Sequence, residues 1–299
     1  MSDRGQRLKQ RTIVGGAIAL ATGALLFLAS GPGGPWFVLG VTAVLAHFCL
    51  QEVWTMGLIQ DSTERFITRI GIVTPFVLLG CLQGRFLDPY ATSNGDRYAA
   101  LVVITLASGP LLAAAAMCLY SKFDKDHVYQ VGSRRRVAAS VAWVAGPLAG
   151  LVIVTEMLGA GALVALMVLS KLGDTAGYYV GSLLGVRHPF PKLSPGKTWA
   201  GCVASLISAT VMGWIFAVTG LFPDPTIGAL SGLLAGATVN VAAQAGDLLE
   251  SWTKRRAGVK DSGTRFGPSG GFLDLVDSLL LSVPVALLLW PVLFAWPGI

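Results

Sequence analysis

Long apolar runs separated by short polar segments make up most of this chain. A membrane-spanning helix needs about 20 predominantly apolar residues, and nine runs come near that length. They lie at residues 13–30, 36–51, 69–83, 99–120, 137–156, 158–174, 199–221, 226–247 and 272–297. The second, third and sixth are short enough to be tilted or re-entrant. The pattern predicts an all-α fold, a polytopic integral membrane helical bundle of about nine transmembrane helices.

The composition agrees with a lipid bilayer as the solvent. Of the 299 residues, 54% are hydrophobic and only 13% are charged, whereas a soluble domain carries about 25% charged residues. The 37 glycines fit the same environment, because small residues let transmembrane helices approach closely. The four cysteines lie in or beside apolar runs without metal-like spacing. They indicate small buried side chains rather than disulfides or metal ligands.

The distribution of basic residues predicts the orientation. With the N-terminus in the cytoplasm, every lysine and arginine except Arg85 and Arg97 falls in a cytoplasmic segment, as the positive-inside rule requires. The net charge of +6 is therefore attributed to loops that face anionic lipid, and no nucleic-acid partner is expected. The first apolar run has features of a signal peptide, but eight further spans favour an uncleaved anchor.

Three polar clusters lie at the predicted cytoplasmic ends of the later spans. They read KLGDTAGYYVG at 171–181, KLSPGKT at 192–198, and AGDLLES at 245–251, the last continuing to Asp277. An ionisable side chain at membrane depth costs about 2.5–3.5 kcal/mol on insertion scales, so each is a candidate for function. No segment is long enough for a separate soluble domain. We expect one membrane-embedded domain, with N-terminal transmembrane helices over 1–170 and a C-terminal transmembrane catalytic region over 171–299.

Two of the acids are three residues apart. This spacing places the carboxylates of Asp274 and Asp277 on one face of a helix. Like charges this close repel unless a cation lies between them, and carboxylate oxygens favour a hard cation such as Mg²⁺. Asp247, at the inner end of the preceding span, could supply a third carboxylate. The alternative is that these acids cap a helix and pair with nearby lysine or arginine.

Basic residues and glycines precede the acidic pair. Lys254, Arg255 and Arg256 alone would be explained as anchors to anionic headgroups. The adjacent Lys260 and Asp261, followed by a glycine-rich segment, indicate more. A glycine-rich turn exposes backbone N–H groups to a phosphate, and basic side chains neutralise its charge.

The stretch SPGKT at 194–198 is similar to a P-loop but does not match it. The pattern requires a glycine where this chain has Pro191, and no strand precedes the stretch. Lys197 and Thr198 could still bind phosphate, although the start of a helix explains the Ser-Pro pair equally well. Acids for a divalent ion and bases for phosphate indicate phosphoryl or nucleotidyl transfer.

These clusters resemble the integral-membrane phosphatidate cytidylyltransferases, or CDP-diacylglycerol synthases. The family signature is S-x-x-K-R-x4-K-D, a glycine-rich loop, and two Asp three residues apart. It is matched in register by Ser251, Lys254, Arg255, Lys260, Asp261, Gly270, Gly271, Asp274 and Asp277. The family's Gly-Asp, D-x-x-A/G-Y and S-P-x-K-T segments are matched by Gly246, Asp247, Asp174, Ser194, Pro195, Lys197 and Thr198. The resemblance covers residues 171–280, and before that only hydropathy agrees.

The resemblance implies that CTP and phosphatidate give CDP-diacylglycerol and diphosphate in phospholipid biosynthesis. It implies Mg²⁺ held by Asp247, Asp274 and Asp277, with a second cation left open, and Lys260 and Asp261 as further catalytic residues. The implied substrate-binding set is Asp174, Ser194, Lys197, Thr198, Ser251, Lys254, Arg255, Gly270 and Gly271. The site would lie on the cytoplasmic side of the cell inner membrane or its equivalent, where CTP arrives from water and the lipid from the bilayer. The chain could act as a homodimer.

The chain departs from the family pattern at three positions. Ser269 replaces the usual His before the glycine pair, Leu275 replaces an Arg, and Ala200 replaces a Glu. These departures leave open a CTP-dependent lipid kinase of the polyprenol or dolichol type, or a cytidylyltransferase of another lipid phosphate. A non-catalytic membrane scaffold or transporter is the alternative from a different class. The carboxylates and the basic residues are retained, which favours an enzyme.

Overall fold

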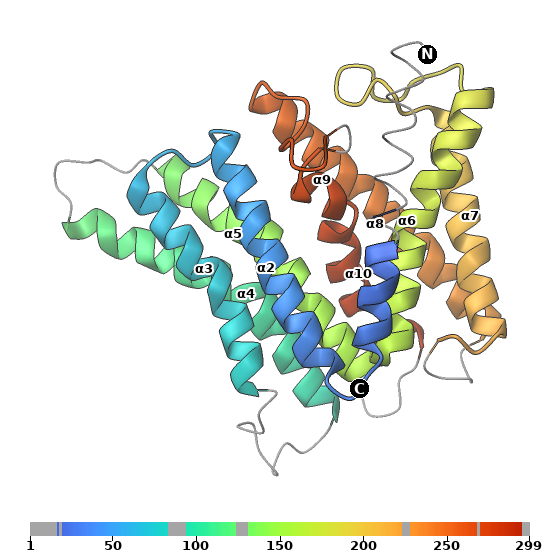
Figure 1. Ribbon diagram of the computed structural model, residues 1–299, viewed down its shortest axis with the longest axis horizontal. Coiled ribbons are helices and arrows are strands. Elements are labelled where there is room, and N and C mark those ends of the chain that lie inside the picture. Colours follow the sequence, from blue (N-terminus) through green and yellow to red (C-terminus); the bar gives the residue numbers. More distant parts are fainter. Residues whose placement is uncertain are drawn as a thin grey trace.

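The computed structural model describes residues 17, 20–82, 94–123, 131–222, 228–267 and 270–294, which form a bundle of helices (Figure 1). The helices are α2 (Gly34–Thr55), α3 (Ser62–Cys81), α4 (Asn94–Phe123), α5 (Val131–Ile153), α6 (Gly159–Leu184), α7 (Trp199–Val218), α8 (Ala229–Arg256), α9 (Phe272–Val276) and α10 (Leu279–Leu293). A π-helical turn, η2 (Val154–Leu158), joins α5 to α6. The described residues contain no strand, so the predicted all-α class is confirmed.

Five helical stretches in the described chain are long and apolar enough to cross a membrane. They are Gly34–Thr55, Asp96–Ser121, Ser133–Leu184, Trp199–Val218 and Phe272–Leu293. The third has 52 residues and would extend about 78 Å as one straight helix, far beyond the roughly 30 Å hydrocarbon core. Gly159, with a φ of +86°, interrupts it, and the chain turns back there. The polytopic membrane bundle is therefore confirmed.

Each predicted span after the first overlaps one of the helices α2 to α10, and the first overlaps a shorter apolar helix at Leu20–Ala29. The number of crossings remains a prediction. So does the cytoplasmic N-terminus, because residues 1–16 lie outside the described part of the chain.

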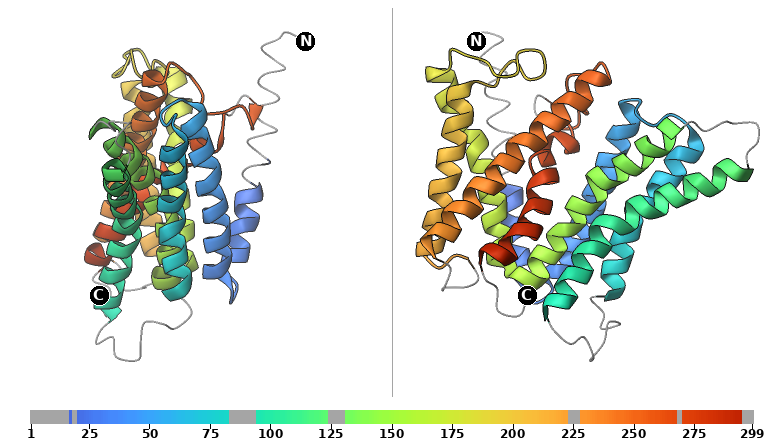
Figure 2. Two further views of the ribbon diagram at one scale, coloured as in Figure 1. Left: turned by 90° about the vertical axis from the view of Figure 1, so that its left-hand side faces the viewer. Right: turned by 180° about the vertical axis from the view of Figure 1, so that it is seen from behind.

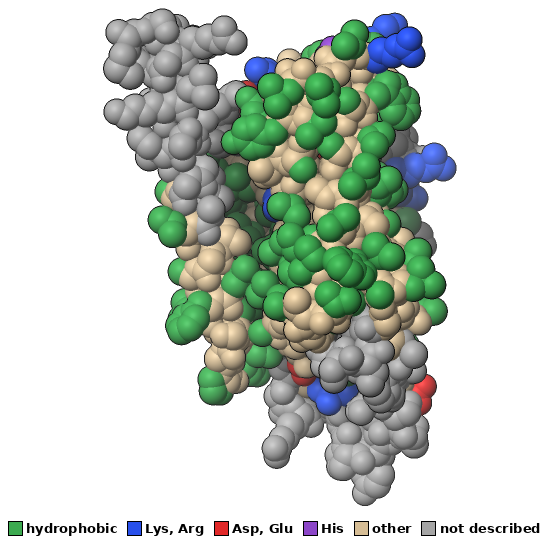
Figure 3. Space-filling view, turned by 90° about the vertical axis from the view of Figure 1, so that its right-hand side faces the viewer, with side chains coloured by type: hydrophobic (Ala, Val, Ile, Leu, Met, Phe, Trp, Pro, Cys, Tyr) green, Lys and Arg blue, Asp and Glu red, His purple; other side chains and the backbone are tan. Residues whose placement is uncertain are grey.

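The outer surface of the bundle suits a bilayer. Along α7, exposed apolar side chains recur every three or four residues, at Val203, Ile207, Val211, Trp214 and Val218. Figure 3 shows the side of the molecule on which α7 lies, and hydrophobic side chains are spread over its described surface from one end to the other. An apolar stripe of this length has no counterpart on a water-soluble helix, so lipid is its solvent.

The polar segments gather at one end of the bundle. The connections at 56–61 and 185–198 and the described part of the next one, 257–267, all lie at the upper end in Figure 1, and the view from behind in Figure 2 agrees. The short helix α9 also lies there and packs against α2. Elements from both halves of the chain therefore build this end, and the three polar clusters recognised in the sequence meet on it.

Candidate active site

Three carboxylates converge where α8 meets the junction of α9 and α10. Asp247 and Glu250 lie about one turn apart on α8, and Asp277 directly follows α9. One oxygen of each lies within 4.8 Å of the others. Gly246 permits the approach, because a Cβ at this position would lie only 2.6 Å from the Asp277 carbonyl oxygen. The sequence therefore places a glycine where α8 approaches the junction of α9 and α10.

A lysine pairs with each of these acids. The ion pairs are Lys197 with Asp247 at 2.6 Å, Lys171 with Asp277 at 3.3 Å, and Lys254 with Glu250 at 2.5 Å. Lys171 lies on α6, Lys197 lies in the segment that leads into α7, and Lys254 lies on α8. The site is thus an alternating set of acids and bases contributed by separate helices, which can bind both a cation and phosphate oxygens.

The donor chemistry of the three acids fits a divalent cation. Glu250 is fully buried, and its Oε2 pairs with Lys254 Nζ at 2.5 Å, whereas its Oε1 has no hydrogen-bond partner among the described residues. A buried carboxylate oxygen without a hydrogen bond is costly, and a hard cation that takes oxygen ligands would satisfy it. Asp247, Glu250 and Asp277 are therefore a candidate divalent-cation site.

Asp274 takes a different part in the site. Its Oδ1 lies 2.6 Å from Lys254 Nζ, while its Oδ2 accepts hydrogen bonds from the backbone N–H groups of Ser262 and Gly271 at 2.9 and 2.8 Å. The sequence predicted Asp274 as a metal ligand together with Asp247 and Asp277. The structure instead brings Glu250 to those two acids. The physical reason is that Asp274 caps the start of α9, as the helix-capping alternative expected.

Glu52, near the end of α2, is a site residue that the sequence analysis missed. It is 4% exposed. Its carboxylate accepts hydrogen bonds from the N–H groups of Phe272 and Leu273 at 2.8 and 2.9 Å, and Ser262 Oγ lies 2.7 Å away. An acid directly after the apolar run at 36–51 was the available signal. It holds the first turn of α9 from the other half of the chain.

The glycines of the loop before α9 make room for these carboxylates. Gly270 adopts a φ of +83°, a conformation that favours glycine, and a Cβ on Gly271 would collide with the Glu52 carboxylate. The expectation was that this loop exposes N–H groups to a phosphate. In the structure Gly270 N–H donates to Gly267 O, and Gly271 N–H donates to Asp274. The N–H groups of Gly270 and Gly271 are therefore hydrogen-bonded within the protein and do not face a phosphate.

The segment before α7 contributes Lys197. Its Nζ reaches the Gln244 carbonyl oxygen at 3.5 Å as well as Asp247, and its backbone N–H donates to Ser194 O. Thr198 is buried and caps α7, because its Oγ1 accepts a hydrogen bond from Gly201 N–H at 3.1 Å. Thr198 therefore positions α7, and Lys197 is the side chain that reaches the acids.

The other predicted residues surround this group. Ser251 is buried on α8, Arg255 donates to the Val259 carbonyl oxygen at 3.0 Å, and Lys260 and Asp261 are exposed in the loop that follows. Asp174 is exposed on α6, one turn from Lys171. Both Lys171 and Glu250 belong to the polar clusters of the sequence but were not among the predicted site residues.

The three departures from the family pattern lie within a few residues of site residues along the sequence. Ala200 is in the first turn of α7, and Leu275 is a partly buried residue of α9 that packs on the hydrophobic core. Ser269 lies outside the described residues.

Known proteins are similar to this chain over much of its length. A family model described as "Cytidylyltransferase family" matches residues 9–293. A phosphatidate cytidylyltransferase of Pseudomonas aeruginosa is 33% identical over 231 residues, which cover 72% of this chain and 84% of that protein. The proteins of the same name from Haemophilus influenzae and Bacillus subtilis are 41% and 40% identical over 37% of this chain. The chain spans only about 40% of the length of these last two relatives.

Proposed function

The chain belongs to the cytidylyltransferase family, and from this premise we propose that it is a phosphatidate cytidylyltransferase. It would convert CTP and phosphatidate to CDP-diacylglycerol and diphosphate, the activity in the name of its relatives. The observation that carries the proposal is the convergence of Asp247, Glu250 and Asp277, each paired with a lysine. This set can hold a cation and phosphate groups side by side.

The reaction requires positioning more than acid–base chemistry. A phosphate oxygen of phosphatidate attacks the α-phosphorus of CTP and forms a new P–O bond. The bond from the α-phosphorus to the bridging oxygen of the β-phosphate breaks, and diphosphate leaves with the electron pair. The attacking phosphate is already an anion near neutral pH, so no strong general base is needed. Neutralising and aligning the phosphates is the main task of the protein.

Asp247, Glu250 and Asp277 would hold the divalent cation, which we propose is Mg²⁺. When bound, such an ion neutralises charge on a triphosphate and on departing diphosphate. Lys171, Lys197 and Lys254 are paired with acids in the structure. With these acids on a cation, Lys171 and Lys197 would be available to phosphate oxygens, for which lysine acts as a compact charge, while Lys254 is also paired with Asp274 at 2.6 Å.

Glu52 and Asp274 support the site from outside the cation group. Together they accept the N–H groups of Gly271, Phe272 and Leu273, which fixes the first turn of α9 and thus the position of Asp277. A reacting group misplaced by about 1 Å can cost about 100-fold in rate. We propose that these two acids position the catalytic group without contacting the substrate.

The position of the site suits two substrates from different solvents. It lies at the end of the bundle where the polar loops gather, within reach of CTP from water and of a lipid from the bilayer. We propose that this end faces the cytoplasm of a cell inner membrane or an equivalent membrane. The lysine and arginine distribution along the chain supports that orientation.

Isotopic labelling tests the proposed function. Purified protein is incubated with phosphatidate, Mg²⁺ and CTP labelled at either the α- or the γ-phosphate. The proposal expects the α-label in the lipid product and the γ-label in diphosphate. Transfer of the γ-label to lipid would instead identify a lipid kinase. Parallel reactions with a polyprenyl phosphate test the acceptor, and no transfer of either label to any lipid would contradict the proposal.

A further inference from the structure

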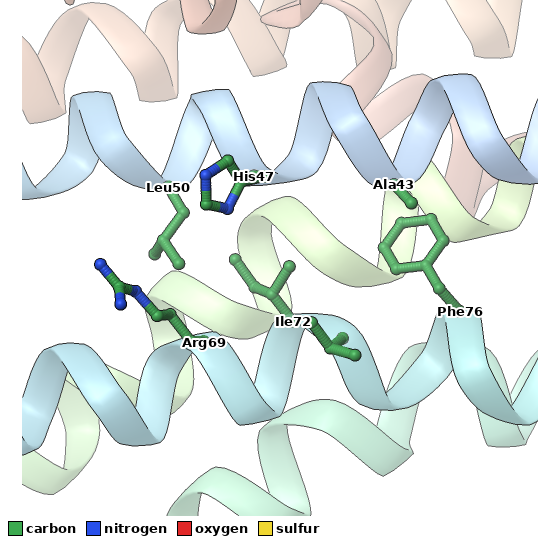
Figure 4. A pocket seen from close by; sticks show the side chains of 7 residues that line it. Ala43, His47, Leu50, Arg69, Ile72 and Phe76 are labelled. Carbon is green, nitrogen blue, oxygen red and sulfur yellow. The ribbon is translucent and has the colours of Figure 1, made fainter.

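Two apolar cavities flank a single arginine on the lipid-facing side of α2 and α3. The first, about 170 Å³, lies between the helices and is lined by Ala43, His47, Leu50, Arg69, Ile72 and Phe76, with Val73. Figure 4 shows Leu50 of α2 and Ile72 and Phe76 of α3 projecting into the space between the two helices, with Arg69 and Leu50 at one end and Ala43 and Phe76 at the other. The second, about 370 Å³, lies along α3 between Arg69 and Leu78. Arg69 and Val73 line both cavities.

Among the described residues, Arg69 has no acidic partner. Within the described part of the chain, its guanidinium makes no ion pair or hydrogen bond and is held only by the Trp54 ring, whose centroid lies 4.7 Å away. The side chain is exposed beside Ile70, Val73 and Val77, which are 39%, 53% and 54% exposed. A charge facing lipid is costly unless an anion meets it.

The depth of Arg69 in the bundle identifies the anion. Arg69 lies seven residues into α3, about 10 Å from the polar end of the helix. A long basic side chain at this depth extends back to the level of lipid phosphates. Both cavities run from Arg69 in the opposite direction, past Val73 toward Phe76 and Leu78. The arrangement therefore has its charge at headgroup level, with one apolar cavity between α2 and α3 and an open apolar groove along α3, both running into the membrane.

We propose that this surface binds one diacyl phospholipid, with its phosphate on Arg69 and one acyl chain in each cavity. The site is separate from the carboxylate group and goes beyond the proposed transfer reaction. It nevertheless lies near the catalytic loop. His47 hydrogen-bonds Gln51 at 2.9 Å, Gln51 accepts from Arg265 at 2.9 Å, and Arg265 stacks on Phe48 and Phe272. A phospholipid held here would lie beside the loop that precedes α9.

Native mass spectrometry of the delipidated full chain tests the proposal. The probe is dioleoyl-phosphatidylglycerol, whose phosphodiester cannot serve as the attacking phosphate of the transfer reaction. We expect one lipid per chain in the wild type and at least about fivefold weaker binding in Arg69→Ala, since a basic residue near the phosphate contributes about 1 kcal/mol. Arg65→Ala is the matched control, because Arg65 also stacks on Trp54 but lines neither cavity. It should bind like the wild type.

A second variant tests the acyl channels. Val73 is half exposed and borders both cavities, so Val73→Trp fills them without disturbing the core, and it should lose phosphatidylglycerol as Arg69→Ala does. Unchanged binding in both variants, or equal loss in Arg65→Ala, would overturn the proposal. Loss of the lipid in Asp277→Asn would place it at the carboxylate group instead, which also overturns the proposal. Label transfer from CTP is measured separately, so failure of the phospholipid site can be told apart from failure of the proposed transfer reaction.

Discussion

The carboxylates of Glu52 and Asp274 share one hydroxyl, that of Ser262. Glu52 Oε2 lies 2.7 Å and Asp274 Oδ2 lies 2.6 Å from Ser262 Oγ. A hydroxyl has one hydrogen, so it donates to one carboxylate at a time. Backbone N–H groups donate to both Glu52 oxygens and to Asp274 Oδ2, and Lys254 donates to Asp274 Oδ1. An acid from α2 and an acid from α9 are thereby joined at the loop that connects α8 to α9. The N-terminal helices are thus part of the active-site framework.

Glu52→Gln should destabilise this junction. The amide keeps the shape of the side chain, but its NH₂ group would face a backbone donor, and an unsatisfied buried group costs about 1–3 kcal/mol. We expect a lower midpoint of thermal unfolding and at least a tenfold lower kcat, with little change in KM for CTP, because the residue positions α9 without binding nucleotide. Label transfer and thermal unfolding measure the two effects.

Glu64→Gln is the control for Glu52→Gln. Glu64 is also 4% exposed in a neighbouring helix, and it pairs with Arg136 instead of the loop. The control should lose stability while kcat stays near that of the wild type. Equal losses of kcat in the two variants would show that buried acids act only through general stability.

Glu250→Gln should raise the Mg²⁺ concentration required for activity. The substitution removes one of three charged oxygen ligands, and even outer-shell changes at metal sites cost about 10- to 100-fold in affinity or activity. A Mg²⁺ titration of label transfer gives the shift. Glu156→Gln is the control, because Glu156 is ion-paired with Arg97 away from the carboxylate group. An unchanged Mg²⁺ requirement in Glu250→Gln would exclude this acid from the cation site.

Lys197→Ala should weaken the use of CTP. Lys197 is 2.6 Å from Asp247 and comes from the segment before α7. Loss of a charged hydrogen-bond donor costs about 1.5–3 kcal/mol, so kcat/KM for CTP should fall by about 10- to 100-fold. Lys192→Ala removes an exposed lysine of the same segment and should leave kcat/KM unchanged. Similar kinetics for both variants would remove Lys197 from the site.

Gly246→Ala should separate α8 from α9. The added Cβ would lie 2.6 Å from the Asp277 carbonyl oxygen, and overpacking of this kind costs about 1–3 kcal/mol. We expect a lower unfolding temperature together with loss of transfer activity, because Asp277 moves away from Asp247. Gly40→Ala, where a Cβ meets no atom within 4 Å, should retain both properties. Full activity in Gly246→Ala would show that the close approach is unnecessary.

The sequence predicted the helical membrane bundle and most of the polar end. Apolar runs determine where helices can cross lipid, and the cost of buried charge directed attention to Asp247 and Asp277. Glu250 could have been predicted as a site residue from its spacing. It lies three residues after Asp247 and four before Lys254, so all three share one face of α8.

Two features of the site required tertiary structure. Spacing alone put Asp274 and Asp277 on one helical face, but α9 ends at Val276, and the first acid caps the helix while the second reaches α8. Glu52 acquires its role only when α2 packs against α9, a contact between the two ends of the chain. No local pattern encodes such a long-range hydrogen bond.

Equilibrium binding of Mn²⁺, followed by electron paramagnetic resonance of the purified protein, tests the central claim most directly. Mn²⁺ prefers the same oxygen ligands as Mg²⁺ and reports binding without turnover. We predict a site in the wild type that is lost or weakened at least tenfold in Asp277→Asn and in Glu250→Gln. Asp274→Asn should retain the site while losing activity. Unaltered Mn²⁺ binding in the first two variants, or its loss only in Asp274→Asn, would contradict the assignment of the cation to Asp247, Glu250 and Asp277.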